Sequence, residues 1–73
     1  MDYTYKIGDN VYLKPLADSR YNIEKDRGRE VTIIDIDKFD PFIPFRIKTV
    51  RGYTYWTTLQ AIEGYFKPLG LRV

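Results

Sequence analysis

A chain of 73 residues with no cysteine and no histidine can build neither a disulfide framework nor the thiolate and imidazole sites that zinc and copper prefer. At this length we expect one small domain, residues 1–73, which has to be stabilised by apolar packing, and aromatic residues make up 16% of the chain. The net charge of +2 is too weak to indicate an anionic partner, and neither a cofactor nor a metal ion is expected.

The N-terminal residues lack the basic start and the apolar stretch of a signal peptide. No run of the chain approaches the roughly 20 apolar residues that a membrane helix needs. We therefore expect a cytoplasmic protein that does not associate with a membrane. The absence of cysteine agrees with a reducing compartment.

Short alternating segments between turn residues predict β-structure almost throughout the chain. The first strand is expected at residues 11–14, with Val11 and Leu13 facing inward. The polar, charged and aperiodic residues 16–29 then predict a loop longer than the common connection of about 4–6 residues. Long loops in compact domains are often functional.

The strand predicted at residues 30–37 changes its apolar face part-way along. Val31 and Ile33 lie on one face at a period of two, whereas Ile34 and Ile36 lie on the other. Such a change of parity indicates a β-bulge or a sharp bend, which lets one strand serve two sheets, as in a barrel. A strand buried on both faces is the alternative.

An apolar connection with two prolines, 38–44, precedes the second half of the predicted sheet. Strand 45–50 should place Phe45 and Ile47 inward. A turn at 51–52 leads to strand 53–57, in which Trp56, opposite in parity to Tyr55, is expected at the core or its edge. One helical turn at 58–61, a brief fifth strand at 62–63 and a tail at 64–73 complete the prediction.

In this order the elements resemble the SH3-like barrel, an all-β fold of five strands with one helical turn before the last strand. The segment 6–13 is similar to its Gly-Asp-x-Val opening, and 28–34 to its Gly-x-x-Gly-x-Val entry to the second strand, with Lys25 in place of the first glycine. Residues 45–56 are similar to its central hairpin, and Leu59 and Ile62 to its closing Leu-x-x-apolar pattern. The resemblance implies a barrel over about 5–63.

In length and style the chain resembles the small stand-alone SH3-like proteins of phage and prophage genomes. This resemblance implies a small binding module, such as a phage-encoded modulator of a host or viral protein. The Ala-Leu-Tyr-Asp-Tyr and Trp-Trp motifs of eukaryotic signalling SH3 domains are missing. Their groove for proline-rich peptides is therefore not implied.

Catalysis is not expected, because the usual nucleophile–base pairs require cysteine or histidine. Asp35 and Asp37 alternate with isoleucines, so they should face solvent and make that strand face soluble. The chain also lacks a glycine-rich phosphate loop. The sequence indicates a protein that binds and is not an enzyme.

The long loop is the first candidate contact surface. Its basic residues Arg20, Lys25 and Arg27 alternate with acidic ones, and Tyr21 lies among them. Mixed charge suits a protein partner better than phosphate, and tyrosine and arginine are common binding hot spots. The alternative is a mobile loop with weak local ion pairs.

The predicted hairpin is the second candidate. Arg46, Lys48 and Arg51 have no acidic residue among them, and Tyr53 and Tyr55 follow on the next strand. Cations beside exposed rings suit single-stranded nucleic acid. The alternative is a solvated strand face.

A further apolar group, Phe39, Phe42 and Ile43, is hard to bury entirely in so small a core. A monomer or a weak homodimer is therefore expected. A protein partner is the principal hypothesis, and nucleic-acid binding is the alternative.

Overall fold

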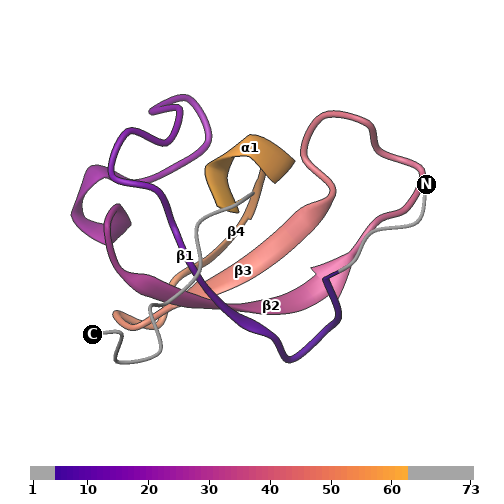
Figure 1. The fold of residues 1–73 in the computed structure, drawn as a ribbon, viewed down its shortest axis with the longest axis horizontal. Helices are drawn as coiled ribbons and strands as arrows, with labels where there is room; N and C mark the ends of the chain where they lie inside the picture. The colour runs from indigo at the N-terminus through magenta and orange to yellow at the C-terminus, as the bar shows by residue number, and fades with distance from the viewer. Residues whose placement is uncertain (1–4, 63–73) are drawn as a thin grey trace.

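The computed structural model describes residues 5–62. These residues form, in chain order, β1 (Asn10–Tyr12), the 3-10 helix η1 (Glu24–Asp26), β2 (Glu30–Ile36), β3 (Phe45–Thr49), β4 (Thr54–Thr57) and α1 (Leu59–Ile62) (Figure 1). The strands form one antiparallel sheet in the order β1-β2-β3-β4. A small, mostly β domain is thus confirmed.

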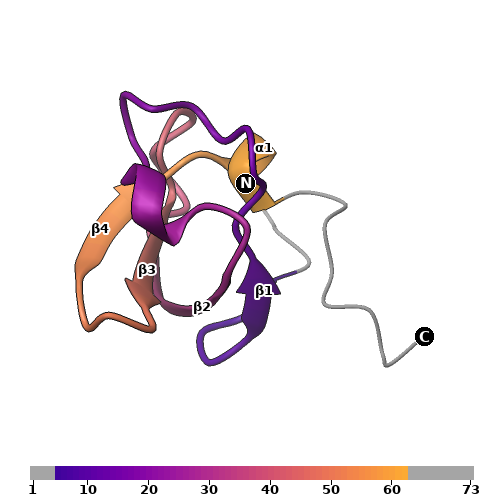
Figure 2. The ribbon, with the colours of Figure 1, turned by 90° about the vertical axis from the view of Figure 1, so that its left-hand side faces the viewer.

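Three of the segments outside the strands gather on one side of the curved sheet (Figure 1). In Figure 1 the long loop, α1 and the connection between β2 and β3 lie above the strands, and the turn between β3 and β4 lies below them. The N–H of Lys14, just after β1, donates to the carbonyl of Ala61 in α1 at 2.8 Å. This bond holds α1 beside the end of the first strand, and Figure 2 shows the same neighbours from the side.

The β-bulge predicted in the second strand is confirmed. Ile33 lies opposite Ile47 and Asp35 lies opposite Arg46, so Ile34 is the extra residue on β2. The insertion resets the alternation, and Ile36 beyond it still packs against the core.

The core consists of side chains from all parts of the fold. Phe45 and Ile47 of β3 are fully buried, as predicted, and the ring of Tyr5 meets that of Phe45 edge-on at a centroid distance of 5.8 Å. The buried apolar cluster contains Val11, Leu13, Ala17, Val31, Ile33, Phe45, Ile47, Ala61 and Ile62.

The turn between β3 and β4 holds three residues. The N–H of Thr49 donates to the carbonyl of Tyr53 at 2.8 Å, and the N–H of Gly52 donates to the carbonyl of Thr49 at 2.9 Å. Gly52 has a φ of 91°, the left-handed conformation that such three-residue hairpins require at their last position.

The end of the described chain differs from the prediction. The helical turn is confirmed as α1, but Ile62 is its last residue, so a fifth strand beginning at Ile62 is wrong. Glu63 and the tail 64–73 lie outside the described residues. Within residues 5–62 the sheet is open, and four strands are present where a closed barrel of five was predicted. The carbonyl of Ala61, in the helical turn as predicted, accepts the N–H of Lys14.

The prediction that Trp56 lies at the core or at its edge is also wrong, because Trp56 is absent from the residues that pack against the core. Trp56 lies opposite the exposed Arg46 and is half-buried on the outer face of the sheet. Tyr55 lies opposite Ile47 and packs against the core.

Candidate functional site

A buried carboxylate holds the long loop in place. Asp26, at the end of η1, is 0% exposed. Nε of Arg51 donates to its Oδ1 at 2.8 Å and Nη2 to its Oδ2 at 3.2 Å, and the hydroxyl of Tyr55 donates to Oδ2 at 3.1 Å. A carboxylate is tolerated at this depth because it is paired and hydrogen-bonded. Arg51 and Tyr55, both predicted contact residues, therefore tie the β3–β4 hairpin to the loop.

The charges of this cluster stabilise one another. The hydrogen bond from Arg51 lowers the pKa of Asp26 against the opposing effect of burial, and the hydroxyls of Tyr55 and Thr49 lower it further. The bond to Asp26 raises the pKa of Arg51. Both groups thus stay charged at neutral pH, and the cluster is a structural ion pair and does not exchange protons there.

The hydroxyl of Tyr55 provides a prediction at alkaline pH. Burial raises the pKa of Tyr55 from 10.0 to about 12, partly opposed by the N–H of Ile23, which donates to its oxygen at 3.4 Å. Because the folded pKa is raised, the hydroxyl's contribution to stability is complete below pH 10 and is lost as the pH rises toward 12. We expect the tyrosinate absorbance of the wild type minus that of Tyr55→Phe to show one group titrating near 12. A group titrating near 10 would contradict the buried hydrogen bond.

A second pair of buried groups fixes the loop against β4. Asn22 is 4% exposed; its Nδ2 donates to the carbonyl of Asp18 at 2.9 Å, and its Oδ1 accepts the hydroxyl of Thr57 at 2.6 Å. Nη1 of Arg27 donates to the carbonyl of Ala17 at 3.3 Å. The loop is therefore held through its own side chains at several points.

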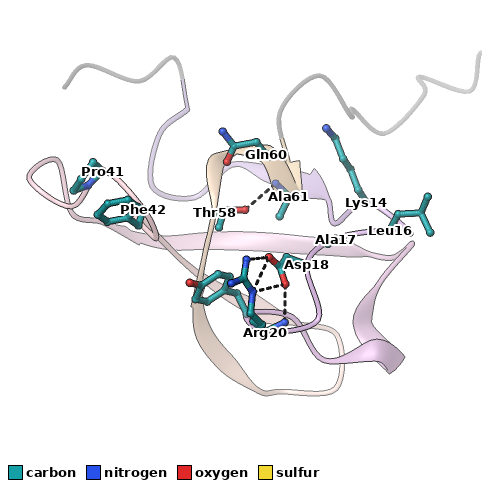
Figure 3. A pocket seen from close by; sticks show the side chains of 11 residues that line it. Lys14, Leu16, Ala17, Asp18, Arg20, Pro41, Phe42, Thr58, Gln60 and Ala61 are labelled. Atoms are coloured by element: carbon teal, nitrogen blue, oxygen red, sulfur yellow. Dashed lines mark hydrogen bonds and ion pairs between the residues drawn. The ribbon is translucent and has the colours of Figure 1, made fainter.

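A groove of about 760 Å³ opens between the fixed loop, the connection 37–44 and α1. Figure 3 shows Leu16 at one end, Phe42 beside Pro41 at the other, and Gln60 and Ala61 of α1 between them. Three segments that are distant in the sequence thus form one concave surface.

Large apolar side chains project at both ends of the groove. Leu16 is 92% exposed and Phe42 is 73% exposed. The carboxylate of Asp40 accepts the N–H of Phe42 at 2.8 Å, and that of Asp37 accepts the N–H of Phe39 at 3.0 Å. These bonds hold the connection in a shape that presents the rings to solvent. Exposed apolar side chains at both ends of one groove suit a binding surface.

Two of the predicted contact residues line this groove. Arg20 donates from Nη2 and Nε to the carboxylate of Asp18, at 2.7 Å to Oδ2 and 3.2 Å to Oδ1. The pair lowers the pKa of Asp18 and raises that of Arg20. The guanidinium also lies 5.5 Å from the ring centroid of Tyr21. The charge of Arg20 is therefore neutralised locally by Asp18.

The other two predicted loop residues lie outside the groove lining. Lys25 is exposed on η1. Arg27 is half-buried, and its Nε is buried without a partner among the described residues. Arg27 therefore helps to fix the loop by its hydrogen bond to the carbonyl of Ala17.

The predicted hairpin residues do not share one surface. Arg46 and Lys48 are exposed on the outer face of β3, as expected. Tyr55 lies on the opposite, core-facing side. Arg51 turns to Asp26, and its guanidinium lies 4.6 Å from the ring centroid of Tyr53. The aromatic residue beside the exposed cations is Trp56, opposite Arg46.

Nothing in the sequence marked Leu16 as a functional residue. It lies between Pro15 and Ala17 at the start of a mostly polar loop, where the apolar residues follow no strand or helix period. For Phe42 the sequence contained one indication of exposure, which was the surplus of apolar residues in its connection. Neither pattern could show that the two residues flank one groove.

Among residues 5–62, no group of His, Cys, Asp or Glu side chains is arranged to hold a metal ion. In the same range, none of the helices combines the length and apolar character needed to cross a membrane. No family model matches the sequence, and comparisons with the curated proteins and the solved structures find no match either.

Proposed function

We propose that this chain is a non-enzymatic binding module whose groove takes up a segment of a protein partner. The observation that carries the proposal is the pair of exposed apolar side chains, Leu16 and Phe42, at the two ends of one groove. The loop on one side is held by Asp26 and Asn22, so the surface is formed before binding. Binding therefore costs little conformational entropy of the loop.

The charge of the groove favours protein over nucleic acid. Its cations are Lys14 and Arg20, and Arg20 already pairs with Asp18, which also lines the groove. A nucleic-acid site needs several cations free to meet phosphates. Apolar ends with a mixed, nearly neutral middle suit a peptide segment that has an apolar anchor for each end.

Several features support a role without catalysis. The chain contains no histidine and no cysteine. The carboxylates of Asp18 and Asp26 are both bound to arginines, and their lowered pKa values make them poor proton donors and acceptors near neutral pH.

We also propose that the fold is an SH3-like barrel of the phage or prophage type, acting in the cytoplasm on a host or viral protein. The order of strands, the bulge at Ile34 and the hairpin at Gly52 support the fold. The bond between Lys14 and Ala61 supports it too, because it draws the end of the described chain to the first strand. A structure of the full chain that shows no fifth strand beside β1 would contradict it.

Selection from a displayed library of random peptides on the immobilised full chain tests the proposed function. We expect enrichment of peptides with two separated apolar residues, and at least about tenfold weaker binding to Leu16→Asp and to Phe42→Asp. Val50→Asp is the matched control, because Val50 is 65% exposed but lies outside the groove. Failure to enrich any peptide, or peptides that bind all three variants equally, would contradict the groove.

Nucleic-acid binding remains the second candidate because Arg46 and Lys48 are exposed beside Trp56. Trp56 is the single tryptophan of the chain, so its fluorescence reports on that face. A titration with an oligothymidylate at low salt discriminates the two functions. Salt-sensitive quenching that is lost in Arg46→Ala would favour nucleic acid, and no quenching would exclude this face as its site.

A further inference from the structure

We propose that the outer edge of β4 binds an extended, acidic segment of a partner protein as an additional strand. This site goes beyond the groove proposed above and does not include Leu16 or Phe42. It rests on the backbone of β4, on the space beside it and on the charges around it.

The backbone of β4 offers unpaired groups. The bond from the N–H of Thr49 to the carbonyl of Tyr53 sets the alternation of the β3–β4 ladder. Residues Tyr55 and Thr57 therefore bond to β3, and the backbone N–H and C=O groups of Thr54 and Trp56 point away from it. Among residues 5–62, no other segment bonds to the backbone of these two residues.

The edge carries little of the protection that natural edge strands have. Such strands are usually blunted by lysine, proline, a bulge or a covering segment. β4 reads Thr-Tyr-Trp-Thr, four residues of high β-propensity without a charge, proline or bulge. Its protections are its shortness and loop residues 19–23, which lie beside it across a gap.

A gap of about 420 Å³ lies along this edge, between β4 and loop residues 19–23. The hydrogen bonds from Thr57 to Asn22 and from Ile23 to Tyr55 fix the loop, so the loop is held in place beside the open edge. A strand added at the usual spacing of about 4.8 Å would run along this gap. Its alternate side chains would contact the rings of Tyr21 and Trp56, which line it.

The charges beside the edge favour an acidic segment. None of the described residues that line the gap is acidic. Nη2 of Arg46 donates to the hydroxyl of Thr54 at 3.3 Å, which places the guanidinium next to the edge, and the exposed Lys48 lies opposite Thr54 in the ladder. Residues on an added strand meet their direct and diagonal neighbours on the same face. A carboxylate that lies beside Thr54 on the outward face of that strand would therefore be next to the guanidinium of Arg46, which already reaches the hydroxyl of Thr54.

Amide hydrogen exchange of the full-length chain with a defined probe tests the proposal. The probe is a short, fluorescein-labelled peptide of alternating valine and glutamate. In the free protein we expect the amides of Thr54 and Trp56 to exchange fast and those of Tyr55 and Thr57 slowly. Saturating peptide should slow exchange at Thr54 and Trp56 by at least about tenfold, because both amides then donate to the added strand.

Two substitutions at one position separate the backbone from the side chain. Thr54→Pro removes an N–H that faces away from β3, which edge strands tolerate, and should weaken peptide binding at least about tenfold. Thr54→Val keeps the N–H and the branched shape, and should bind within about threefold of the wild type. If Thr54→Pro does not fold, the exchange pattern of the wild type alone decides.

Four outcomes would overturn the proposal. One is peptide binding that leaves Thr54 and Trp56 in fast exchange, and another is no binding at millimolar peptide. Equal affinity for an alternating valine–lysine peptide would overturn the acidic character. Protection that grows with protein concentration alone would assign the edge to a second copy of the chain. Leu16→Asp should bind the probe as the wild type does, so failure of the groove and failure of the edge are distinguishable.

Discussion

Replacing Phe45 with alanine is expected to leave most of the protein unfolded at room temperature. Phe45 is fully buried, opposite Ile36 on β2 and Thr57 on β4. Truncating a buried phenylalanine costs about 3–5 kcal/mol, and the edge-on contact with Tyr5 adds about 1 kcal/mol to that loss. A single core of this size rarely supplies more than about 3–5 kcal/mol of net stability. The expected loss is therefore about as large as the whole net free energy of unfolding of the wild type.

Circular dichroism and Trp56 fluorescence during thermal and urea unfolding measure this effect. Phe42→Ala is the matched control, because Phe42 lies three residues earlier in the chain, on the connection that precedes β3, and is 73% exposed. Its stability should change by no more than about 0.5 kcal/mol. A cooperative transition of Phe45→Ala close to that of the wild type would show that the core is not built around this ring.

The inward and outward faces of β1, β2 and β3 were predictable because burial follows a local period of two. Val11 and Leu13 alternate with polar residues, and so do Phe45 and Ile47. The bulge was visible for the same reason, since the apolar residues of β2 change parity at Ile34. These features depend only on neighbours within a few residues.

The faces of β4 were not predictable because they depend on the length of the turn before it. A two-residue turn at 51–52 would place Trp56 opposite Ile47, on the core face. The observed turn has three residues, 50–52, so Tyr55 takes that position. A shift of one residue moves every side chain of a strand to the other face. Because of this one-residue difference, Tyr55 lies on the core side of the sheet, and Arg46 and Lys48 lie on the outer side. The three residues therefore do not form the surface that was predicted.

The groove and the buried ion pair could not be read from the sequence because each joins distant segments. Arg51 and Asp26 are 25 residues apart, and nothing near either one marks it as half of a buried pair. Leu16 and Phe42 lie at the two ends of a groove that exists only after the loop and α1 have packed. The sequence did predict the long loop as a candidate surface, and Arg20 and Tyr21 do line the groove.

Replacing Asp26 with asparagine is expected to destabilise the protein by about 2–3 kcal/mol, somewhat less than breaking a fully buried pair, because Arg51 reaches solvent. Asparagine has nearly the same shape, but it removes the charge that Arg51 and Tyr55 bind. The melting temperature should fall by roughly 10–20 °C for a domain of this size. Because the long loop and the hairpin meet at Asp26, we expect loop amides near η1 to lose protection from exchange as well.

Acid titration of the same variant shows whether the carboxylate itself is responsible. The pKa of Asp26 is lowered from its ordinary value of 3.8, chiefly by Arg51. Its contribution is therefore complete above pH 3.8 and is lost as the pH falls through the folded pKa, so wild type and Asp26→Asn should converge in strong acid. Asp18→Asn is the matched control, a second carboxylate of the same loop bound by an arginine but partly exposed, and its melting temperature should stay close to that of the wild type. Equal losses of melting temperature in the two variants would mean that burial of Asp26 does not distinguish the two ion pairs. A difference in stability between wild type and Asp26→Asn that persists in acid would show that the shape of the side chain, and not its charge, causes the loss.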